Sequence, residues 1–198
     1  MLYRSYPDSV TVGGVKYPVN TDFRLMMSFE LSVQKKGDTE KIIRDFYCGN
    51  IPEDTNGAVN AMIDFYLCGV KPEGKTGDGS VKRCYAYDED WKYITAAFRQ
   101  QYNIDLNKSD MHWWEFSALF TGLTDNTEFV KIMQYRCTDL RKIKNAEEKA
   151  RIRRLQQRYA LEENRVKKYA SAAERDAAML ADIKRRHEAL KKEGVNNG

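Results

Sequence analysis

The sequence is short of the residues from which most catalytic and metal sites are built. It holds only two histidines, His112 and His187, and neither stands in a recognisable motif with a serine or a cysteine. The four cysteines, at positions 48, 68, 84 and 137, match no CxxC metal or redox spacing. We therefore predict no catalytic residue, no metal ligand and no cofactor-binding residue, and we expect that the protein is not an enzyme.

Long apolar runs and a signal peptide are also missing. No stretch of 18 apolar residues is present to cross a membrane, so we expect no membrane partner. The first residues, MLYRSYPDSV, lack the apolar core of a signal peptide. From this we expect a cytoplasmic protein in which the four cysteines remain free thiols.

Charge is unevenly spread along the chain. Residues 1–140 hold 16 Lys+Arg against 20 Asp+Glu, whereas residues 141–198 hold 17 against 9, so the net charge of +4 comes from the C-terminal part. These basic residues allow two interpretations. They contact the phosphates of a nucleic acid, or they form a solvated helix face with pairs such as Glu147–Arg151 and Glu163–Lys167. We favour the solvated face and do not expect nucleic acid as a partner.

Residues 9–19, SVTVGGVKYPV, predict a β-hairpin. Apolar and polar residues alternate on both sides of Gly13 and Gly14, which supply the positive φ angles of a two-residue turn. Pro18 is typical of an edge strand because it has no backbone N–H to donate. A hairpin alone is unstable in water, so it must lie on helices or pair with another chain.

Apolar residues at helical spacing then predict three helices in the first half of the chain. The first begins at Thr21 or Asp22 and ends at Gly37, the second runs from 38 or 39 to Gly49, and the third ends at Gly69. Residues 70–83 contain three glycines and a proline and predict a flexible loop. A short strand is an option for residues 84–87.

The stretch from Trp91 to Leu140 contains all three tryptophans and predicts three further short helices packed on one another. The first follows the acids at 88–90 and ends at Asn103, which can take the left-handed cap. Ser109 is the expected N-cap of the second, which Gly122 ends, and the third begins at 126 or 127. We expect this stretch to hold the centre of the core.

From Asn145 the chain lacks glycine and proline until Gly194 and is rich in Ala, Glu, Lys, Arg and Leu, which predicts one long helix. An interrupted apolar seam runs along it, formed by Ile152, Leu155, Tyr159, Val166, Tyr169, Leu180, Ile183 and Leu190. Three interpretations remain open: the seam docks on the core or on a partner, it forms a coiled-coil oligomer, or the helix is mostly solvated.

The predicted fold is therefore mainly α, with an N-terminal β-hairpin, a multi-helix core and a long basic C-terminal helix. We divide the chain into a helical core over 1–140, a charged helical extension over 141–193 and a disordered end over 194–198.

Four segments carry a resemblance to a known family: FRQQYNIDL at 98–106, HWWEF at 112–116, LFTGLTDNTEFVKIMQYRCTDL at 119–140 and RYAL at 158–161. Their order and spacing resemble the bacteriophage "gene product fifteen" family of siphophages of Gram-positive bacteria. The resemblance covers roughly residues 9–161, and the tail from Glu162 runs past it. Its signature positions in this chain are His112, Trp113, Trp114, Phe116, Tyr135 and Arg136.

Genes of that family lie between those of the tail-tube and tape-measure proteins, where tail assembly chaperones are usually encoded. The resemblance therefore implies a chaperone-like protein that binds the tape-measure protein, and possible further partners are tail-tube subunits. It implies a location in the cytoplasm of the bacterial host and absence from the mature virion. The alternatives are a nucleic-acid-binding accessory protein that uses the basic C-terminal helix, or a structural virion connector or tail-completion protein. Self-association through that helix is a further option.

Overall fold

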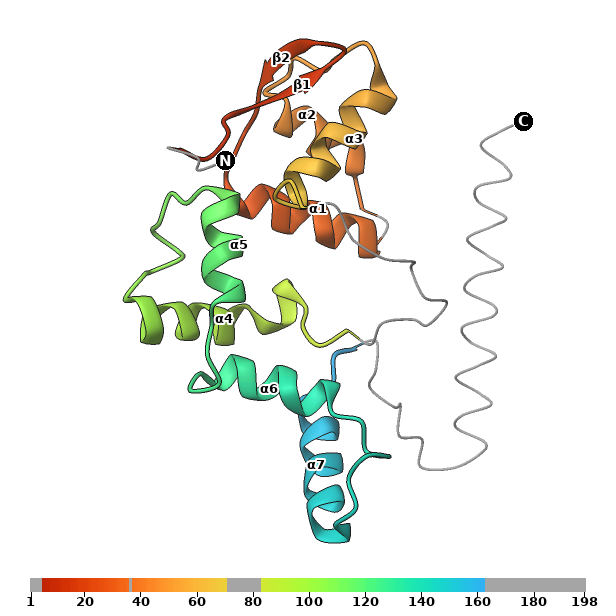
Figure 1. Ribbon diagram of the computed structural model, residues 1–198, viewed down its shortest axis with the longest axis vertical. Helices are drawn as coiled ribbons and strands as arrows, with labels where there is room; N and C mark the ends of the chain where they lie inside the picture. Colours follow the sequence, from red (N-terminus) through yellow and green to blue (C-terminus); the bar gives the residue numbers. More distant parts are fainter. Residues whose placement is uncertain (1–4, 36, 71–82, 163–198) are drawn as a thin grey trace, which may run out of the picture. The chain divides into compact units, whose positions relative to one another are not determined.

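The computed structural model describes residues 5–35, 37–70 and 83–162 (Figure 1). Within these ranges it contains one β-hairpin and seven helices. In chain order the elements are β1 (Ser9–Val12), β2 (Val15–Pro18), α1 (Phe23–Lys35), α2 (Thr39–Phe46), α3 (Thr55–Tyr66), α4 (Tyr87–Tyr102), α5 (Trp113–Thr121), α6 (Glu128–Cys137) and α7 (Ala146–Arg158). The prediction of a mainly helical fold with an N-terminal hairpin is confirmed.

The hairpin has the predicted turn and lies on α3. β1 and β2 pair antiparallel, and Val12 faces Val15 across the turn. Gly13 and Gly14 have φ angles of 58° and 82°, which residues with a Cβ rarely adopt. Val12 is buried, and β1 packs against α3, as Figure 1 shows. The helices thus supply the apolar support that an isolated two-stranded hairpin lacks.

α2 and α3 end in the same way, at the positions that the sequence predicted. Each helix is followed by a cysteine and a glycine that both have positive φ, Cys48–Gly49 and Cys68–Gly69. In each case the glycine N–H donates to a carbonyl of the last helical turn, which satisfies an acceptor that the helix leaves unpaired. The reversal after α3 directs the chain past α5 and contributes to the candidate site described below.

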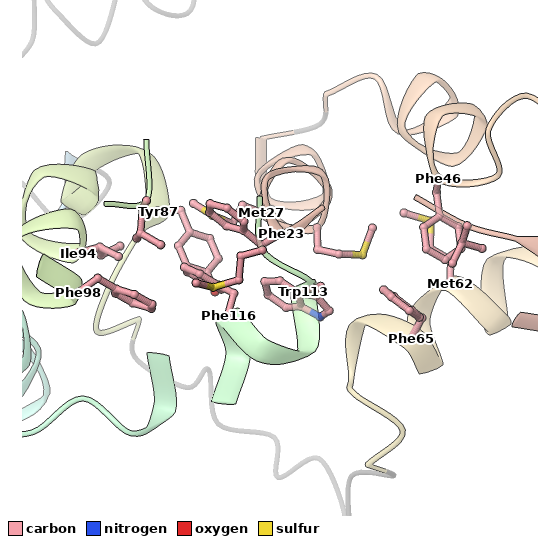
Figure 2. Packing of buried hydrophobic residues seen from close by; sticks show 14 of the residues in the cluster. Phe23, Met27, Phe46, Met62, Phe65, Tyr87, Ile94, Phe98, Trp113 and Phe116 are labelled. Atoms are coloured by element: carbon pink, nitrogen blue, oxygen red, sulfur yellow. The ribbon is translucent and has the colours of Figure 1, made fainter. Parts of the chain in front are cut away.

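The core is centred on Phe116 of α5, as expected for the stretch around the tryptophans. Its ring is fully buried and lies 4.8 Å from the ring of Phe23 and 5.2 Å from that of Phe98, measured between centroids. Figure 2 places Trp113 between this group and a second group that contains Phe65. Each such ring removes about 150–250 Å² from water, so the aromatic residues supply much of the driving force for folding.

The N-termini of α1 and α5 are joined by their backbones. The N–H of Trp113 donates to the carbonyl of Thr21 at 2.7 Å, and the N–H of Phe23 donates to the carbonyl of Met111 at 3.2 Å. His112 rather than Ser109 is therefore the N-cap of α5, which corrects the prediction. The hydroxyl of Ser109 instead donates to the carbonyl of Asp105.

The segment before α4 also differs from expectation. α4 begins at Tyr87, and no strand forms over residues 84–87. Cys84 and Cys137 form a disulfide, with their Cα atoms 5.6 Å apart, whereas four free thiols were expected. The spacing of 53 residues gave no sign of this pair, because only the packing of this segment against the end of α6 brings the two together. Cys48 and Cys68 are free.

The C-terminal helix ends much earlier than predicted. α7 stops at Arg158, and the chain turns so that Leu161 is 1% exposed. The side chain of Gln156 donates to two carbonyls at the end of α6, so α7 belongs to the compact unit. Among the described residues the compact unit continues to Leu161, whereas the predicted core ends at 140. The remaining predicted helix, the expected disordered end and nearly all of the expected loop over 70–83 lie outside the described residues.

Candidate interaction surfaces

His112 is held in a structural role. Its Nδ1 accepts a hydrogen bond from the backbone N–H of Trp114 at 3.0 Å, which caps α5. Its Nε2 lies 2.9 Å from the carbonyl of Pro7, so Nε2 carries the proton in this arrangement. Tyr6 stacks on the imidazole ring at 5.0 Å. Both nitrogens are therefore occupied by the backbone, and neither is available as a catalytic base.

Trp113 and Trp114 attach α5 to the end of α3. The indole N–H of Trp113 donates to the carbonyl of Tyr66 at 2.8 Å, and that of Trp114 donates to the carbonyl of Phe65 at 2.9 Å. Both acceptors belong to the last turn of a helix, where carbonyls lack partners within the helix. Trp113 is buried, whereas Trp114 remains half-buried at the surface.

Arg136 joins three segments at the other end of the unit. Its guanidinium forms a bidentate ion pair with Asp90 of α4 and donates to the carbonyls of Cys84 and Tyr159. Tyr135 stacks on the ring of Tyr159 at 6.3 Å. The signature residues therefore form two groups, one around α5 and one where α7 meets α6, and each group holds the fold together.

The predicted apolar seam is only partly described. Its first three members lie on α7 or at its C-terminal cap: Ile152 is buried, and Leu155 and Tyr159 are half-buried. For the buried Ile152, the option of docking on the core describes what is seen. Val166, Tyr169, Leu180, Ile183 and Leu190 lie outside the described residues.

An open hollow lies beside Trp114. It has a volume of about 480 Å³, and we call it the α5 hollow; its lining residues are Tyr6, Cys68, Trp114, Ser117, Ala118, Thr121 and Gly122. The lining is mostly apolar, and burial raises the pKa of the Cys68 thiol, which keeps it uncharged at neutral pH. Three distant segments build this surface, so the sequence signalled only its helical part, through the tryptophan pair.

A second hollow, of about 320 Å³, lies between α1 and α4. Arg24 and Asp88 contribute charges to its lining, and Asp88 pairs with Lys35 of α1. Arg24 is itself engaged, because it binds Asp22 and two backbone carbonyls. The described residues that line the α5 hollow, by contrast, include no charged side chain.

No three side chains of metal-binding type come together among residues 5–35, 37–70 and 83–162. In these ranges no helix is both long and apolar enough to cross a bilayer.

Comparison with known families identifies the compact unit. The family model described as "Bacteriophage Gp15 protein" matches residues 3–161, and this match ends at the residue where the compact unit ends. No curated protein and no solved structure matches the chain. Since the family model covers most of the sequence, the chain belongs to the bacteriophage Gp15 family.

Proposed function

We propose that this phage protein is a tail-assembly-chaperone-like factor that acts through protein–protein contacts and holds the tape-measure protein while the tail tube assembles. Membership of the Gp15 family supports a phage role. In this proposal the protein comes from a siphophage of a Gram-positive host, works in the cytoplasm of that host and is absent from the mature virion. Tail-tube subunits are a second partner.

The observation that carries the proposal is the α5 hollow. A tape-measure protein is a long helical chain, and before the tube covers it the chain exposes amphipathic stretches. A groove beside a tryptophan is a typical place for an apolar side chain of such a helix. Burying one leucine or phenylalanine side chain contributes about 1.5–3 kcal/mol. That is roughly a 10- to 150-fold gain in affinity for each side chain inserted.

The test is a co-expression pull-down with the tape-measure protein encoded in the same genome. Ala118 is exposed on α5 and lines the hollow, so A118R fills the hollow with a charged side chain while keeping a good helix former. The matched control is A96R, because Ala96 is an exposed alanine on α4 that does not line the hollow. We expect A118R to lose at least about tenfold in capture and A96R to behave as wild type.

A truncated variant in the same pull-down, together with analysis of purified virions, separates the remaining alternatives. A truncation after Leu161 keeps the whole compact unit. It is expected to retain binding at high salt, because the contact is apolar. If the full chain does not capture the tape-measure protein at any salt concentration, the proposed binding of that protein is contradicted. Recovery of the protein from purified virions at fixed stoichiometry would instead favour a connector or tail-completion role.

A further inference from the structure

Positive charge is concentrated in one short part of the described chain. Residues 141–158 hold eight basic side chains and two acidic ones. Their net charge of +6 is larger than the +4 of the whole protein. Most of the basic character that the sequence places in the C-terminal part therefore belongs to α7 and to the turn before it, inside the compact unit.

The arginines of α7 stand on its outer side. Ile152 is buried, which fixes the face that α7 turns toward the unit. Arg151, Arg154 and Arg158 are exposed and follow one another at spacings of three and four residues. We call these three residues the arginine ridge. At a helical rise of about 1.5 Å per residue they form a row roughly 10 Å long.

Within the described residues, no acidic side chain forms an ion pair with this ridge. The expected pair Glu147–Arg151 does not form, and within residues 83–162 none of the three ridge arginines makes an ion pair. The guanidinium of Arg158 lies over the ring of Tyr159, 5.5 Å from its centroid. The helix face is solvated, as favoured on sequence grounds, but the Glu147–Arg151 pair expected on it is absent, and Glu163–Lys167 lies outside the described residues.

In the part of the chain that the structure describes, the surface around the ridge lacks the apolar centre of a protein-binding site. The large hydrophobic side chains that are exposed in the described residues are Tyr6, Val15, Val33, Ile51, Ile63 and Val70. None of them lies on α6 or α7. Protein–protein interfaces usually have an apolar core, whereas nucleic-acid interfaces are polar and strongly positive. Guanidinium groups also match phosphate oxygens through paired hydrogen bonds.

From these observations we propose that the arginine ridge of α7 binds the phosphodiester backbone of a nucleic acid, without regard to base sequence. The ridge shares no residue with the α5 hollow. The inference therefore goes beyond the proposed chaperone role and does not depend on it.

The test measures binding of the full-length protein to a fluorescein-labelled 20-nucleotide oligo(dT) and to a 20-base-pair duplex by anisotropy. If three ridge arginines contact three phosphates of a single strand, affinity falls about 20-fold between 50 and 200 mM NaCl. In R151Q/R154Q one contact remains, and the fall shrinks to about threefold. The matched control is K41Q/R44Q, which removes two exposed charges at the same spacing from α2.

Unchanged thermal unfolding of both variants shows that folding is intact. The proposal requires that K41Q/R44Q keep the wild-type salt dependence while R151Q/R154Q loses it. It is overturned by absence of binding to both probes at 50 mM NaCl, or by equal behaviour of the two variants. Competition by poly-glutamate as strong as that by unlabelled oligo(dT) would assign the ridge to an acidic protein instead. The variant A118R should bind both probes as wild type does. A failure of the chaperone proposal can therefore be told apart from a failure of the nucleic-acid proposal.

Discussion

The guanidinium of Arg136 and the carboxylate of Asp90 meet in a bidentate ion pair that is almost wholly buried. The Nη1–Oδ2 and Nη2–Oδ1 distances are 2.6 and 2.9 Å, and the two side chains are 7% and 1% exposed. The same guanidinium donates to the carbonyl of Tyr159 at 2.6 Å, just after α7. One side chain thus links α4, α6 and the end of the compact unit.

Replacing Arg136 by alanine should destabilise the protein by about 3–5 kcal/mol, because the Asp90 carboxylate would remain buried without its partner. R136K keeps the charge but loses the planar guanidinium, so its stability should lie between those of wild type and R136A. Urea unfolding measures both losses. The control is R44A, since Arg44 forms an exposed pair with Glu40 and should cost less than about 1 kcal/mol. A loss for R136A as small as that for R44A would contradict the structural role.

Stability should fall steeply in alkaline solution. Burial, and to a lesser extent the neighbouring Tyr17, raises the pKa of Tyr47 from 10.0 to about 12. Its hydroxyl donates to the carbonyl of Ala58 at 2.7 Å, which a phenolate cannot do. A raised folded-state pKa stabilises the fold below pH 10, and this stability is lost as the pH rises through 12. The loss from Tyr47 amounts to about 2–3 kcal/mol.

The measurement is urea unfolding of wild type and Y47F at pH 8, 10 and 11.5. Y47F should be less stable at pH 8 by about 1 kcal/mol, because the hydrogen bond is missing. Its stability should then decline less than that of wild type as the pH rises. Burial also raises the pKa values of Tyr66, Tyr85 and Tyr87, so some decline remains in the variant. Parallel curves for the two proteins would refute the assignment to Tyr47.

Loss of the disulfide between Cys84 and Cys137 should destabilise the protein by roughly 2–4 kcal/mol, because the bridge closes a loop of 53 residues. The comparison is between wild type and C84S/C137S, unfolded in urea with and without dithiothreitol. Cys137 is exposed, so a reductant reaches the bridge. The control C48S removes an exposed free thiol and should change nothing. Alkylation of four thiols after unfolding without reductant would show that the bridge is absent.

Local features of this fold were open to prediction. The hairpin turn at Gly13–Gly14, the left-handed cap at Asn103 and the helix ends at Gly49 and Gly69 all appear where expected. Each depends on the backbone preferences of a few consecutive residues. The predictions of where α5 begins and where α7 ends were wrong for the same reason. Contacts with residues distant in the sequence decide both boundaries: the carbonyl of Pro7 at His112, and the guanidinium of Arg136 at Tyr159.

The sequence by itself determined the helical class, the aromatic core and the concentration of positive charge after residue 140, because apolar periodicity and composition are properties of the chain. Only the tertiary structure decided which side chains meet. Asp90 and Arg136 are 46 residues apart, and the α5 hollow draws on Tyr6, Cys68 and Trp114. Such contacts depend on how the helices pack. For this reason the family signature residues form the framework, and one of them, Trp114, also lines the α5 hollow.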